Sequence, residues 1–82
     1  MGMVKGTYVQ CTKTGKLGVV ERTPGTSDGQ YTHVEWLISW DVKDGAVHPH
    51  HYLEYVCIEE LKELPINETH MGLHALRWRI LR

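Results

Sequence analysis

Apolar and polar residues alternate along four short runs of this chain, at residues 4–12, 17–22, 32–40 and 53–58. A period of two places successive side chains on opposite faces and is typical of a β-strand with one buried face. The alternation is strongest in the third run, where one face carries Val34, Trp36, Ile38 and Trp40. The pattern therefore predicts a mainly β protein.

Glycine and polar residues separate these runs and predict the turns between the strands. Residues 13–16 form a short polar turn that joins the first two predicted strands into a hairpin. The dipeptide Asp44-Gly45 is a second hairpin signal. Residues 23–30 have the composition of an exposed loop. Gly18 lies inside the second strand, which indicates a bulge or a close approach of the neighbouring backbone.

Two prolines mark the places where the strand pattern changes. Pro49 has no N–H to donate to a strand ladder, so we expect residues 47–52 to form an edge strand or a loop. Residues 58–64 place leucine and isoleucine at helical spacing, but Pro65 follows at once. This arrangement predicts a single helical or 3₁₀ turn rather than a longer helix.

The last segment, residues 66–82, fits two structures. As a helix capped by Asn67 it presents Leu73, Leu76 and Ile80 on one side. Residues 76–81 also alternate as a strand does, and Gly72 weakens the start of a helix. We favour the helix and keep the strand as the alternative.

Composition and charge narrow the class of protein. Eighty-two residues with 41% apolar side chains and no Phe predict one globular domain in which Trp and Tyr supply the aromatic packing. The net charge is −1, with −3 over residues 1–65 (six Lys and Arg, nine Asp and Glu) and +2 over residues 66–82 (three Arg, one Glu). This balance argues against a general nucleic-acid binder.

Two cysteines are too few for a disulfide scaffold, and we expect Cys11 and Cys57 to be buried thiols rather than a disulfide or metal ligands. No apolar run approaches the roughly 18 residues that a membrane span needs. We expect a cytoplasmic protein without a membrane partner and without a cofactor.

The strand pattern resembles the SH3-like small β-barrel, and most closely its KOW and Tudor-type members. The resemblance rests on Gly18-Val19-Val20, on Val34-x-Trp36 and on a closing Val56-x-x-Glu59-Glu60-Leu61-x-x-Leu64. It implies a five-stranded barrel over residues 1–65, with a short helical turn near 58–64, whose loops and aromatic residues bind peptides, modified side chains, RNA or ribosomal surfaces. The basic, apolar extension 66–82 goes beyond what such a barrel requires.

Histidines and exposed aromatic residues are the first candidates for binding. His48, His50 and His51 flank Pro49, and imidazoles at this spacing can converge on a transition metal. The paired spacing of a zinc site is absent, so we interpret them as part of a polar loop and expect no metal. Aromatic side chains on neighbouring loops can form a cation cage or a stacking platform. The candidates for such a surface are Tyr8, Tyr31, Trp40 and Tyr52.

Carboxylates are expected to be solvated: Glu54, Glu59, Glu60 and Glu63 would form an acidic face near the closing turn.

The tail supplies Arg77, Trp78 and Arg79, and Arg and Trp are enriched at binding hot spots. This segment either packs back on the barrel, or associates with a second copy, or contacts phosphates.

The sequence thus predicts a non-enzymatic binding module that recognises a protein partner or a second copy of itself. The alternatives are a nucleic-acid or ribosome-associated accessory protein and, less favoured, a small oligomeric enzyme with a site between barrels.

Overall fold

The computed structural model describes residues 3–22 and 30–82. Its strands are β1 (Tyr8–Cys11), β2 (Leu17–Arg22), β3 (Tyr31–Lys43), β4 (Ala46–Cys57) and β5 (Leu61–Leu64). A 3₁₀ turn, η2 (Ile58–Glu60), precedes β5, and one helix, α1 (Met71–Leu81), ends the chain. Apart from Gln30, the loop predicted at 23–30 lies outside the described residues.

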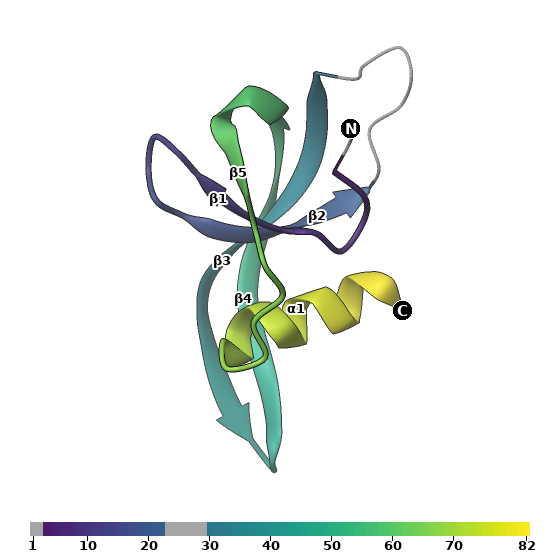
Figure 1. Ribbon diagram of the computed structural model, residues 1–82. Coiled ribbons are helices and arrows are strands. Elements are labelled where there is room, and N and C mark those ends of the chain that lie inside the picture. Colours follow the sequence, from purple (N-terminus) through teal and green to yellow (C-terminus); the bar gives the residue numbers. More distant parts are fainter. Residues whose placement is uncertain (1–2, 23–29) are drawn as a thin grey trace.

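All five strands belong to one open antiparallel sheet with the order β4-β3-β2-β1-β5 (Figure 1). The mainly β prediction is confirmed, and so is the helix in the tail. The helical turn is also present but shorter than expected, because residues 61–64 form β5 and pair with β1.

The long β3–β4 hairpin extends beyond the other strands and gives the molecule its elongated shape, with extents of 43 × 27 × 21 Å (Figure 1). It turns at Asp44 and Gly45, which both have positive φ, as the hairpin signal predicts. β4 runs through Pro49 without interruption and lies at the edge of the sheet. The edge-strand prediction is therefore confirmed, because an edge strand pairs on one side only and can accommodate a proline.

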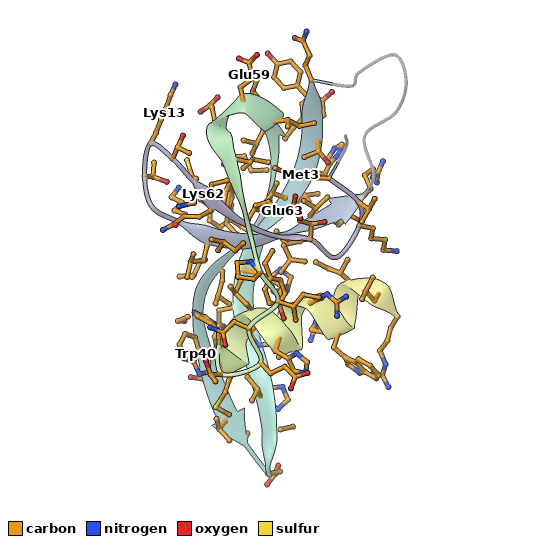
Figure 2. The ribbon with its side chains drawn as sticks, in the orientation of Figure 1. Met3, Lys13, Trp40, Glu59, Lys62 and Glu63 are labelled. Carbon is orange, nitrogen blue, oxygen red and sulfur yellow. The ribbon has the colours of Figure 1, made fainter. Side chains whose placement is uncertain are left out.

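A β-bulge divides the hairpin into two parts. Leu37 pairs with His51 and Ser39 pairs with His50, so Ile38 has no opposite residue and is 66% exposed. An extra residue shifts the alternation by one position. As a result Leu37 and Trp40 both pack against α1. Figure 2 shows Trp40 beside the start of this helix. The predicted common face of Val34, Trp36, Ile38 and Trp40 is therefore wrong beyond Trp36.

The sheet is covered by apolar side chains on both faces. One cluster of buried residues contains Val9, Cys11, Val20, Val34, Trp36, Val56 and Leu61. The second lies between the sheet and α1 and contains Tyr8, Val19, Leu73 and Leu76. Adjacent residues of one strand, such as Val19 and Val20, therefore enter different clusters, and the tail completes the core instead of projecting from it.

The start of α1 differs from the prediction in its cap. His70, not Asn67, is the N-cap, and its Nδ1 accepts a hydrogen bond from the Leu73 N–H at 3.2 Å. Asn67 instead accepts from the N–H and the hydroxyl of Thr69, at 3.0 and 2.6 Å. These bonds hold a turn before the helix. None of the described helices is long and apolar enough to cross a membrane.

Candidate binding groove

A groove of about 540 Å³ lies between the outer face of α1 and the tip of the β3–β4 hairpin. Ala46, Val47 and His48 of β4 line one side. Met71, Ala75 and Trp78 of α1 line the other. The helix buries Leu73 and Leu76 on the sheet, so the neighbouring stripe at positions 71, 75 and 78 is left to face the groove.

The groove carries more positive than negative charge. Its rim includes Arg79 and Arg82, with Glu68 as the single carboxylate among its lining residues, which gives a formal charge of +1 when histidine is neutral. The guanidinium of Arg82 lies 5.8 Å from the centre of the Trp78 ring. Within the described ranges Arg79 forms no ion pair with a carboxylate. The groove therefore combines an apolar floor with cationic groups at its edge.

Only two of the three tail candidates belong to this groove. Trp78 is 60% exposed and Arg79 is exposed, and both line it. Arg77 points elsewhere: its Nε donates to the carbonyl of Gly6 at 2.9 Å, and the residue is half-buried. The structure therefore assigns Arg77 to the attachment of α1, because its N–H satisfies a backbone acceptor of the body.

The histidines do not converge. His48 lines the groove, whereas the Nε2 of His50 lies 2.8 Å from Asp41 Oδ2 and the Nδ1 of His51 lies 2.7 Å from Glu35 Oε2. Residues 50 and 51 face opposite sides of β4, as neighbours in a strand must. In residues 3–22 and 30–82 no three His, Cys, Asp or Glu side chains are grouped to hold a metal ion. The hydrogen bond from His50 lowers the pKa of Asp41 below its ordinary value.

The aromatic candidates are likewise dispersed. Tyr8 is 1% exposed and belongs to the core, so its prediction as a surface residue is wrong. It faces the apolar side of α1, a partner that the alternation of β1 alone does not reveal. Tyr31 stacks on Tyr55 with ring centres 5.3 Å apart. The Lys16 ammonium donates a hydrogen bond to the Tyr52 hydroxyl at 2.5 Å, and the ring of Trp40 packs on the ring of His70.

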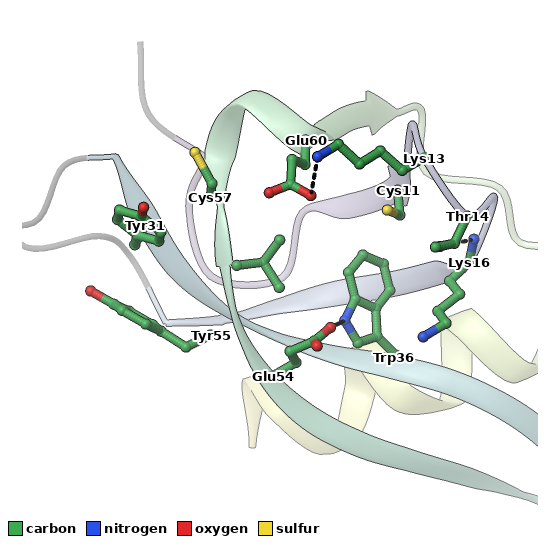
Figure 3. A pocket seen from close by; sticks show the side chains of 11 residues that line it. Cys11, Lys13, Thr14, Lys16, Tyr31, Trp36, Glu54, Tyr55, Cys57 and Glu60 are labelled. Atoms are coloured by element: carbon green, nitrogen blue, oxygen red, sulfur yellow. Dashed lines mark hydrogen bonds and ion pairs between the residues drawn. The ribbon is translucent and has the colours of Figure 1, made fainter.

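A second pocket, of about 260 Å³, opens near the stacked tyrosines at the other end of the sheet (Figure 3). Two pairs of its polar side chains bond to each other. Trp36 Nε1 donates to Glu54 at 2.6 Å, and the ammonium of Lys13 lies 3.6 Å from the carboxylate of Glu60. Glu54 is exposed, in agreement with its predicted place on a solvated face, and it also accepts the hydrogen bond of the buried Trp36 indole.

Both cysteines line this second pocket and are free thiols, Cys11 buried and Cys57 half-buried. They come from different strands, β1 and β4, and Figure 3 shows them apart. Hydrogen bonds from Thr14 lower the pKa of Cys11.

On the helix side, the groove residues that sequence reasoning did not name as binding candidates are Glu68, Met71, His74, Ala75 and Arg82. Met71, Ala75 and Arg82 lie seven and three residues before Trp78 and four residues after it, which is helical spacing, so the sequence holds a signal for them once the tail is known to be a helix. Their counterparts on the hairpin, Ala46 and Val47, carry no such signal, because only the packing of α1 brings them close.

Comparisons with protein-family models, with curated proteins and with solved structures found no match to this chain.

Proposed function

We propose that this chain is a non-enzymatic binding module that holds a short apolar and acidic segment of a protein partner in the groove between α1 and the β3–β4 hairpin. One observation carries the proposal. His48 lies far from Trp78 and Arg79 in the sequence, yet all three line the same groove. Two separate groups of candidate binding residues thus form one surface.

The apolar floor argues for a partner with apolar side chains. Met71 and Trp78 are large, exposed and on the same stripe of α1. Burying a side chain of this size contributes about 1.5–3 kcal/mol, and tryptophan beside arginine is a frequent hot spot in protein interfaces. A leucine or a methionine of the partner would fill the groove between these residues and Val47.

The rim argues for a partner with acidic side chains. Arg79 and Arg82 outnumber the one carboxylate of the groove, and both are exposed. A carboxylate brought to Arg79 gains a charge-assisted hydrogen bond without displacing an existing partner. Charge complementarity thus selects the acidic class of segment and orients it along the helix.

We further propose that the sheet belongs to the SH3-like barrel class. The strand order β4-β3-β2-β1-β5 and the 3₁₀ turn immediately before β5 support this assignment. The division at residue 65 then separates the strands of the barrel from the helix that covers one of its faces. The two free thiols support a reducing, cytoplasmic location.

The nucleic-acid alternative has less support from this geometry. Two arginines on an apolar groove offer few phosphate contacts, and residues 1–65 carry a net charge of −3. The enzyme alternative requires a pocket between copies of the chain that is lined by His48, His50 or Tyr52. In the chain itself these three side chains have separate surroundings.

The proposal is tested with a short fluorescent peptide of leucine and glutamate, and with a second peptide in which lysine replaces glutamate. Fluorescence anisotropy is expected to show binding of the acidic peptide only. Trp78→Ala and Arg79→Glu should each weaken that binding about tenfold or more, because each removes a central contact of the groove. Ile38→Ala and Lys62→Glu are the matched controls, since both residues are exposed and neither lines the groove.

Four results would contradict the proposal. The first is equal binding of the two peptides, and the second is a loss of binding in the control variants as large as in the groove variants. Tight, strongly salt-dependent binding of single-stranded RNA or duplex DNA, lost in Arg79→Glu, would favour the nucleic-acid alternative instead. A concentration-dependent dimer that Trp78→Ala dissociates would identify a second copy as the occupant.

A further inference from the structure

A separate cavity of about 310 Å³ lies on the other side of the start of α1. Leu17, Leu64, Pro65 and Leu73 form its apolar wall. Three residues with polar groups, Tyr8, Asn67 and His70, complete the lining. A few polar groups within an apolar wall are typical of a site for a small molecule, and the volume lies at the lower end of the range for such sites.

The hydroxyl of Tyr8 is the unusual group in this cavity. The side chain is 1% exposed, and its oxygen is the one buried side-chain polar atom without a hydrogen-bond partner in the described part of the chain. Buried polar groups are nearly always paired, because an unpaired one loses its hydration without compensation. Burial raises the pKa of Tyr8, so the phenol stays protonated and can donate.

The bonds of the other two polar residues leave each of them a group that can donate. His70 Nδ1 accepts from the Leu73 N–H, so the neutral ring carries its proton on Nε2. Asn67 Oδ1 accepts from both groups of Thr69, which leaves the amide nitrogen of Asn67 to donate. The packing of Trp40 on His70, with ring centres 5.2 Å apart, fixes the imidazole further.

We propose that this cavity binds a small apolar compound that carries one neutral carbonyl oxygen, which accepts a hydrogen bond from the Tyr8 hydroxyl. Three lining residues that each keep a group able to donate favour a ligand with an acceptor, and the four apolar residues favour a hydrocarbon body. A neutral acceptor fits better than a carboxylate because the charges that act on Tyr8, from Arg77 and Glu68, are opposite in sign. This site is independent of the groove and of the peptide proposed to occupy it.

Acetophenone and cumene test the proposal, because they have nearly the same shape and only acetophenone has a carbonyl. Binding is measured by NMR from the methyl shifts of Leu64 and Leu73. We expect acetophenone to bind the wild-type chain about tenfold more tightly than cumene, the effect of one buried hydrogen bond. In Tyr8→Phe the two compounds should bind equally, since the ring remains and only the donor is lost.

A second measurement on the same variant needs no ligand. Removing an unpaired buried hydroxyl should raise the melting temperature, or at least not lower it. Tyr31→Phe is the matched control, because Tyr31 is an exposed tyrosine on the opposite pocket, and it should change neither readout.

Absence of methyl shifts with acetophenone would overturn the proposal. So would a preference for acetophenone that Tyr8→Phe leaves intact. A clear fall in melting temperature for Tyr8→Phe would also overturn it, because the hydroxyl would then already be satisfied in the free protein by an ordered water.

Discussion

At the scale of single residues, the three tryptophans show how position decides the role of one side-chain type. Trp36 is buried and gives its N–H to Glu54. Trp40 is half-exposed and packs on His70 and on the backbone of Gly72. Trp78 is exposed in the groove beside Arg82. In a chain without Phe, aromatic packing and candidate binding therefore compete for the same few residues.

Close packing around Trp36 makes a prediction for Gly18. A methyl group at this position would lie 2.7 Å from the Glu35 carbonyl oxygen and 2.7 Å from Trp36 Cε3. The backbone cannot move away without breaking the pairing of β2 with β3. We expect Gly18→Ala to lower the free energy of unfolding by about 1–3 kcal/mol, the usual cost of overpacking a core. Urea denaturation measures this change.

Gly72→Ala is the control for this prediction. Its added methyl group would approach side-chain atoms of Trp40 and Leu37 rather than backbone, and alanine favours a helix by about 1 kcal/mol over glycine. The loss of stability should therefore be smaller than for Gly18→Ala. A larger loss at Gly72 would contradict this account of the two contacts.

At the scale of elements, the β3–β4 hairpin carries the largest difference between pattern and structure. The alternation of residues 32–40 predicts the strand and the faces of its first half correctly. The bulge at Ile38 then reverses the faces, and no local signal marks it, since isoleucine is an ordinary strand residue. The bulge is explained only by the helix: it brings both Leu37 and Trp40 to the side that α1 covers.

The outer half of the hairpin also supports a prediction about pH. The bond from His50 lowers the pKa of Asp41. A carboxyl with a lower pKa in the folded state stabilises the fold above its ordinary pKa, and this contribution is lost as the pH falls through the folded value. We expect an NMR titration of the Asp41 carboxyl carbon to give a lower pKa in the wild-type chain than in His50→Ala.

His51→Ala is the control, because His51 points to the other face of the sheet, where its hydrogen-bond partner is Glu35 of β3. It should leave the titration of Asp41 unchanged. Equal pKa values for Asp41 in the wild-type and His50→Ala chains would show that the bond is not maintained in solution, as is common for exposed pairs.

At the scale of the whole molecule, the sequence predicts the elements better than their assembly. Strands, turns, the edge position of β4 and the helical tail all follow from local patterns. The groove does not, because it exists only where α1 crosses the hairpin and brings His48 close to Trp78. The same crossing buries Tyr8, a residue that β1 alone presents as exposed. Long-range packing therefore determines which candidate residues remain available for binding.

The helix α1 contributes both to stability and to the candidate binding site, since one side of it completes the core and another side lines the groove. Leu76 is fully buried against Tyr8 and Val19. We expect Leu76→Ala to lower the free energy of unfolding by about 2–5 kcal/mol, through lost burial and the cavity that remains. A domain of this size has about 5–10 kcal/mol in total, so the variant should unfold at a much lower urea concentration.

Trp78→Ala provides the contrast on the same helix. Because Trp78 is 60% exposed, its removal should change the free energy of unfolding by no more than about 0.5 kcal/mol while peptide binding is lost. Comparable destabilisation by both variants would mean that the groove face of α1 serves the core, and the weakened binding of Trp78→Ala would then report unfolding. We expect instead that Leu76→Ala lowers stability and that Trp78→Ala weakens binding. This result would show that one face of the 11-residue helix stabilises the fold and another face binds the peptide.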